Sequence, residues 1–70
     1  MKESDRLKGA LFESRPYVEY WDRLKETVEA LWEASRDEEE FLGLLQREIE
    51  KTEEPFKTDL RIFLQKFEAL

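Results

Sequence analysis

Apolar side chains in the first half of the chain recur at alternating steps of four and three residues. The clearest run is Tyr17, Trp21, Leu24, Val28 and Leu31. Because an α-helix turns once every 3.6 residues, this spacing places all five side chains on one helix face. Three more residues widen that face: Val18, Tyr20 and Trp32. A face this broad contacts two neighbouring helices rather than one, so the pattern predicts a helix over residues 15–35 inside a bundle.

The start of this helix is predicted from Ser14 and Pro16. A serine side chain accepts a hydrogen bond from a free amide at a helix start. Proline is tolerated in the first turn, where its missing N–H has no partner to lose. We therefore expect Ser14 to act as the N-cap.

A second helix is predicted over residues 38–53. Asp37 is a candidate N-cap, with Glu40 three residues on, and acidic residues in a first turn suit the helix dipole. The apolar face that follows is Phe41, Leu42, Leu44, Leu45 and Ile49. Gly43 lies within it and lowers helix stability by about 1 kcal/mol relative to alanine. We interpret Gly43 as a point where a neighbouring helix approaches closely.

The junction between these two helices has an alternative interpretation. The spacing of four and three continues through Ser35 and Glu38, which allows one unbroken helix that serves as a coiled-coil arm. Two adjacent polar positions in such a seam are costly. A turn at residues 35–37 also accounts for the capping residues, and it is the favoured reading.

A third helix is predicted over residues 56–70, because the residue before Pro55 disfavours helical geometry. Its stripe is Phe56, Leu60, Phe63, Leu64, Phe67 and Leu70, and Ile62 lies off it. A weaker pattern predicts a short helix over residues 5–14, capped by Ser4, with Phe12 pointing away from its apolar side.

The expected fold is therefore all-α, a small antiparallel helical bundle of three main helices plus a short N-terminal helix, forming a single domain over residues 1–70. Short connections place consecutive helices antiparallel. The predicted core is Trp21, Leu24, Val28, Leu31, Leu42, Leu45, Ile49, Leu60, Phe63, Leu64 and Phe67.

The composition excludes most kinds of catalytic site and metal site. The 70 residues contain no His and no Cys. They therefore lack the usual acid–base group at neutral pH, the partner that would activate a serine, and the preferred zinc ligands. We expect no enzyme activity, no catalytic residue, no metal and no cofactor.

The net charge limits the classes of partner, and the absence of targeting signals indicates the location. With 12 basic and 18 acidic residues the net charge is −6, which argues against direct binding to nucleic acid or to an anionic membrane surface. No signal peptide or membrane span is evident, so the expectation is a soluble cytoplasmic protein. The shortage of thermolabile residues is typical of thermophilic proteins and equally of computational designs.

What remains is a choice among binding proteins. Aromatic residues make up 13% of the chain, more than one thin core is expected to absorb. The candidate partner-binding residues are Tyr17, Tyr20, Trp32, Phe12, Phe41 and Ile62. The leading hypothesis is a protein–protein interaction module that presents an aromatic helix face to a protein partner, since Trp and Tyr are enriched in interface hot spots. The alternatives are an acidic mimic of nucleic acid that inhibits a basic protein, and a structural bundle that self-associates as a homodimer.

Overall fold

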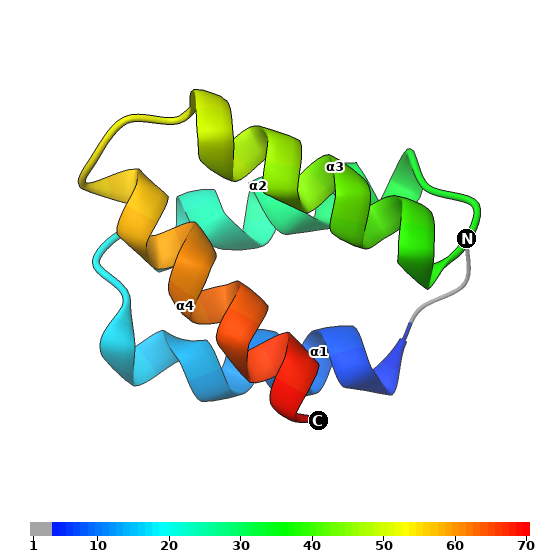
Figure 1. Cartoon of the computed structure of the whole chain (residues 1–70). Coiled ribbons are helices and arrows are strands. Elements are labelled where there is room, and N and C mark those ends of the chain that lie inside the picture. The colour runs from blue at the N-terminus through cyan, green and yellow to red at the C-terminus, as the bar shows by residue number, and fades with distance from the viewer. Residues whose placement is uncertain (1–3) are drawn as a thin grey trace.

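The computed structural model describes residues 4–70, and this part of the chain is all-α, without a strand (Figure 1). Its elements are α1 (Asp5–Ser14), the 3-10 turn η1 (Arg15–Tyr17), α2 (Trp21–Glu33), α3 (Glu38–Lys51) and α4 (Phe56–Ala69). Successive helices run in roughly opposite directions, and α4 crosses obliquely in contact with α1, α2 and α3. The predicted fold class is confirmed.

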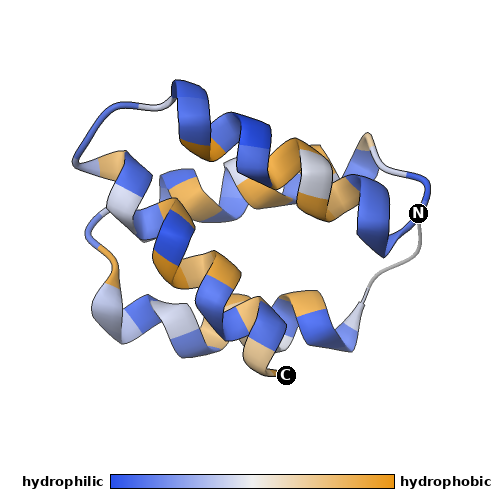
Figure 2. Cartoon of the chain, in the orientation of Figure 1, coloured by the Kyte–Doolittle hydropathy of each residue, from blue (hydrophilic) through white to orange (hydrophobic). Residues whose placement is uncertain are grey.

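An aromatic cluster fills the centre of the bundle. The Trp32 ring of α2 lies edge-on to Phe41 of α3, with ring centroids 5.0 Å apart. Phe41 in turn meets Phe63 and Phe67 of α4 at 6.3 and 5.4 Å. Edge-to-face pairs of this kind are worth about 0.5–1.5 kcal/mol each beyond the area they bury. Figure 2 shows the apolar stretches of these helices turned toward one another.

Arg6 fastens α1 to the rest of the bundle. Its Nε donates a hydrogen bond to the carbonyl of Phe67 at 3.0 Å, and its guanidinium lies 4.4 Å from the centroid of the Phe67 ring. The same guanidinium pairs with Glu38, the first residue of α3. One side chain therefore joins the start of α1 to the start of α3 and the end of α4.

The predicted helix over residues 15–35 is wrong at its start. α1 runs to Ser14, η1 follows, Val18 is extended, and α2 begins only at Trp21. Ser14 does not cap α2. It precedes η1 without a capping hydrogen bond from its side chain, because its buried hydroxyl donates to the carbonyl of Ala10 at 2.7 Å. Pro16 lies in the first turn of η1 instead of an α-helix.

The segment just before α2 is held by a distant residue. Asp59 of α4 is buried, and its carboxylate oxygens accept hydrogen bonds from the amides of Glu19 at 3.2 Å and Tyr20 at 2.8 Å. Tyr20 occupies the N-cap position of α2, and no side chain within residues 4–70 accepts from the free amides of its first turn. α2 therefore starts where α4 supplies an acceptor.

The other helix starts agree with their sequence signals. Ser4 accepts from the amide of Leu7 at 3.3 Å, and Asp37 accepts from the amide of Glu40 at 2.8 Å. The Glu40 carboxylate accepts from the amide of Arg36 at 2.7 Å, which completes a capping-box-like arrangement. The turn between α2 and α3 is thereby confirmed, and the continuous coiled-coil helix is wrong.

The predicted core is mostly confirmed. Seven of its residues are buried: Leu24, Val28, Leu45, Ile49, Leu60, Phe63 and Phe67. Leu31, Leu42 and Leu64 are half-buried and pack against this core from its edge. Trp21 is also only half-buried. It turns toward α1, where its indole N–H donates to the carbonyl of Leu11 at 3.1 Å.

The close approach by a neighbouring helix that we predicted at Gly43 is found at Gly9 instead. A Cβ added at Gly43 would meet no atom within 4 Å, so no neighbour approaches there. A Cβ at Gly9 would lie 3.2 Å from Cδ1 of Leu70. Gly9 therefore permits the end of α4 to pack against α1.

Leu45→Ala should lower the free energy of unfolding by about 2–5 kcal/mol, because Leu45 is fully buried and its truncation leaves a cavity. Urea denaturation measures the loss. Leu44→Ala, one position along the same helix and half-buried, is the control and should cost clearly less. Equal losses at the two positions would contradict the described orientation of α3.

Asp59→Ala should lower the free energy of unfolding by about 1–3 kcal/mol, the cost of leaving a hydrogen-bonding group without its partner. The reason is that the amides of Glu19 and Tyr20 both lose their acceptor. Asp59→Asn keeps one side-chain oxygen and should lose less. If denaturation finds Asp59→Ala as stable as the unsubstituted chain, these two hydrogen bonds do not stabilise the fold in solution.

Gly43→Ala should raise the free energy of unfolding by about 0.5–1 kcal/mol, because alanine favours a helix interior and the site is open. Gly9→Ala should gain less, since its methyl group must displace Leu70. Thermal unfolding of both variants provides the comparison, and a larger gain at Gly9 would rule out close packing of Leu70 there.

Candidate protein-binding surface

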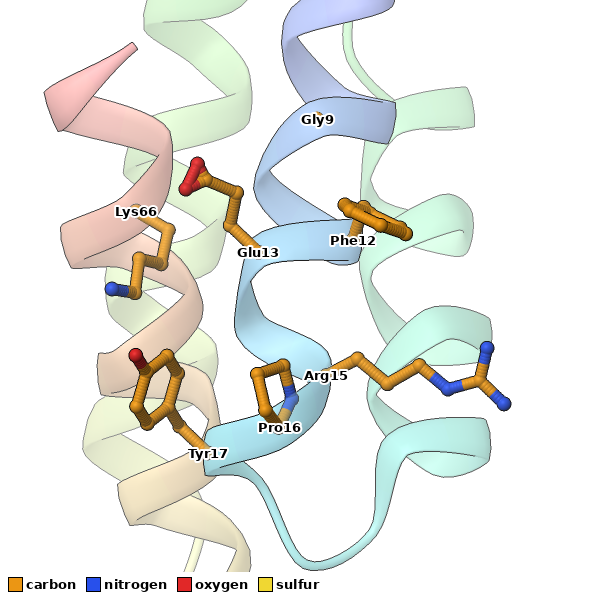
Figure 3. A pocket seen from close by; sticks show the side chains of 7 residues that line it. All are labelled: Gly9, Phe12, Glu13, Arg15, Pro16, Tyr17 and Lys66. Atoms are coloured by element: carbon orange, nitrogen blue, oxygen red, sulfur yellow. The ribbon is translucent and has the colours of Figure 1, made fainter.

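An open groove runs beside the second half of α1, between that helix, η1 and the last turns of α4 (Figure 3). Its volume is about 800 Å³. We call it the Phe12 groove, and its lining residues are Gly9, Phe12, Glu13, Arg15, Pro16, Tyr17 and Lys66. Residues at the two ends of the chain therefore build one surface.

Two aromatic side chains stand exposed in the Phe12 groove. Phe12 is 76% exposed and Tyr17 is 63% exposed. Phe12 points outward because Leu7, Ala10 and Leu11 occupy the buried side of α1. Tyr17 is the last residue of η1, just before the chain becomes extended to meet Asp59. These rings are apolar surface that the bundle itself leaves uncovered.

Charged side chains flank the aromatic residues. The Lys66 ammonium lies 4.5 Å from the centroid of the Tyr17 ring, and the Arg15 guanidinium lies 4.7 Å from the Trp21 ring. Within residues 4–70, the Glu13 carboxylate makes no hydrogen bond or ion pair. The groove thus combines an apolar centre, two cations held over rings and one unpaired carboxylate.

A family model covers all of these elements: that of the MJ1579 family matches residues 4–70. The chain belongs to the MJ1579 family. Comparison with curated proteins and with solved structures found no match. The family is described by this name alone, so membership adds no activity, ligand or partner to what the geometry shows.

The structure of this MJ1579 family member brings together only part of the predicted set. Phe12 and Tyr17 share the Phe12 groove, whereas Tyr20, 45% exposed, does not line it. Ile62 is half-buried on α4 and is also absent from the lining.

Trp32 and Phe41 require correction as surface candidates. Trp32 is 7% exposed and Phe41 is fully buried. They lie off the centre of their own helix stripes, but α4 crosses both helices, and its Phe63 and Phe67 rings cover them. Neither ring is available to a partner while the bundle is folded.

Sequence reasoning missed the other lining residues of the Phe12 groove. Gly9 in a helical segment was the one available signal, because such a glycine often marks a close approach. Nothing in the local pattern places Lys66 beside Tyr17, since their meeting depends on how α4 docks against α1 and η1.

A second hollow lies at the turn between α3 and α4, but its charges are largely satisfied internally. Arg23 lies 4.1 Å from the centroid of the Phe56 ring, and Lys51 pairs with Glu48 at 3.3 Å. Hydrogen bonds from the Thr58 hydroxyl, and then from its amide, hold the pKa of Glu54 below its ordinary value. This hollow therefore has few unpaired polar groups that could bind a ligand.

Within residues 4–70, no three side chains of the His, Cys, Asp or Glu type gather closely enough to hold a metal ion. No helix there is both long enough and apolar enough to cross a membrane.

Proposed function

We propose that this MJ1579 family member is a non-enzymatic protein–protein interaction module that binds a protein partner through the Phe12 groove. The observation that carries the proposal is the exposure of Phe12 and Tyr17, at 76% and 63%, on one continuous groove. Aromatic side chains are enriched at protein interfaces because each buries a large rigid surface.

The shape of the groove favours a protein over a small molecule. Small-molecule sites are concave and cover most of their ligand. The Phe12 groove is open along its length, and Phe12, one of its lining residues, points outward with 76% of its surface exposed. A protein surface can cover the whole of this open groove, whereas a small molecule bound there would stay largely in contact with water.

Local chemistry supports a binding role without catalysis. The chain has no His or Cys, and two of its serines, Ser14 and Ser35, donate their hydroxyls to helix carbonyls at 2.7 Å. A serine engaged in this way, with no base beside it, is not activated as a nucleophile.

The groove also argues against the acidic-mimic alternative. Its cations are Arg15 and Lys66, against one carboxylate, so this face is not acidic. At the acidic start of α3, Glu38 and Glu40 already pair with Arg6 and Arg36. We therefore assign the net charge of −6 to solubility and helix capping.

Site-specific photocrosslinking tests the proposal. A benzoylphenylalanine at position 12 should crosslink to a defined protein in extract of the source cells, and unlabelled protein should compete. The same probe at Ala30, exposed on α2, is the control and should give no such product. Equal or absent crosslinking at the two positions would refute the proposed surface.

Once the crosslinked partner is purified, alanine variants measure the contribution of each ring. Phe12→Ala and Tyr17→Ala should each weaken binding by about 2 kcal/mol, and salt should change these two losses little, because buried apolar contacts are not screened. Tyr20→Ala, an exposed aromatic outside the groove, should leave affinity nearly unchanged. Calorimetric titration gives all three values. Binding lost at half-molar salt (~0.5 M) but kept by both groove variants would favour an acidic face instead.

A further inference from the structure

We propose that the partner seated on the Phe12 groove is a second copy of this chain, in a symmetric dimer in which each Phe12 enters the groove of the other copy. This inference rests on the proposed function and names its partner. The argument depends on where the groove residues stand around α1 and on their charges.

The groove is complementary to itself in shape. Figure 3 shows Phe12 and Arg15 pointing to one side of α1, while Glu13, Tyr17 and Lys66 lie on the other side. A two-fold axis parallel to α1, lying in the contact plane, exchanges these sides between the copies. The projecting Phe12 of each copy then faces the partner's hollow side, which Tyr17 borders. Such an isologous contact uses the same patch twice and closes at two copies.

The charges are complementary under the same rotation. Glu13 and Arg15 lie on opposite sides of α1, so the axis that places Phe12 in the groove also sets Glu13 of each copy toward Arg15 of the other. Within the described residues neither the Glu13 carboxylate nor the Arg15 guanidinium has an ion pair, and that guanidinium lies over the Trp21 ring. Both groups are therefore free to form two symmetric ion pairs across the contact.

The position of Lys66 adds a contact for the incoming ring. Its ammonium already lies 4.5 Å from the centroid of the Tyr17 ring. A Phe12 ring arriving beside Tyr17 comes within reach of the same cation, and cations are attracted to aromatic faces within about 6 Å. The groove thus holds an aromatic ring and a cation where the second Phe12 would enter.

Net charge explains why two copies would meet at this face. The chain carries 18 acidic and 12 basic residues, so two copies repel each other over most approaches. The Phe12 groove carries two cations and one carboxylate, so two copies repel each other less there than across their acidic faces. A contact confined to its seven lining residues is small, and interfaces below about 1,200 Å² are typical of weak, transient complexes. We therefore expect a reversible dimer.

Sedimentation equilibrium of the full chain, from about 10 µM to about 1 mM, tests the dimer in this weak range. The unsubstituted chain should show a monomer–dimer equilibrium. Phe12→Asp should raise the dimer dissociation constant by about 30-fold or more, as expected for loss of a central aromatic contact. Tyr20→Ala, outside the groove, should leave it unchanged. A dimer that Phe12→Asp does not weaken would overturn the inference.

A charge-exchange pair tests the symmetry. Glu13→Arg and Arg15→Glu should each weaken self-association, because like charges then face each other across the axis. An equimolar mixture of the two variants should associate more tightly than either alone, since both cross-axis pairs become attractive again. Circular dichroism confirms that each variant is folded. If folded Glu13→Arg dimerises as well as the unsubstituted chain, the proposed ion pairs are absent and the inference fails.

The two proposals fail separately. A chain that stays monomeric at about 1 mM overturns self-association. If the probe at position 12 then crosslinks to a different protein, the proposed function stands without the dimer. If it crosslinks to nothing, both are rejected.

Discussion

The carboxylate of Asp59 determines how the first half of the chain meets the second. It accepts the amides of Glu19 and Tyr20, which precede α2 and have no acceptor nearby in sequence. Because this acceptor sits on α4, α2 begins where α4 docks, and the chain before it must reach Asp59 in an extended conformation. That geometry ends η1 at Tyr17 and leaves its ring on the surface beside Lys66. The position of Tyr17 in the Phe12 groove thus depends on a part-buried hydrogen-bonded contact.

The same crossing of α4 decides which aromatic residues are core and which are surface. Trp32 and Phe41 lie at the margin of their helix stripes, and α4 brings Phe63 and Phe67 across them. Phe12 and Tyr17 lie beyond the reach of these rings and remain exposed. The packing of α4 therefore divides the aromatic residues into a buried cluster that stabilises the fold and a pair that remains on the surface.

α1 depends on tertiary contacts for its place. Arg6 ties its first turn to Phe67 and Glu38, and Gly9 admits Leu70 near its middle. With its buried side held against α4, the helix turns Phe12 outward and sets Glu13 and Arg15 on opposite sides. The surface to which we assign binding is therefore held in place by the bundle core.

Local interactions made much of the fold predictable from the sequence alone. Apolar spacing identifies the helices, and caps such as Ser4 and Asp37 lie within three residues of the amides they serve. The start of α2 could not be read in this way, because Asp59 is 40 residues from Glu19 and 39 from Tyr20. Periodicity also named Phe12 and Tyr17 as candidate binding residues, but it could not separate them from Trp32 and Phe41. Exposure depends on which helix covers a face, and here the packing of α4 decided it.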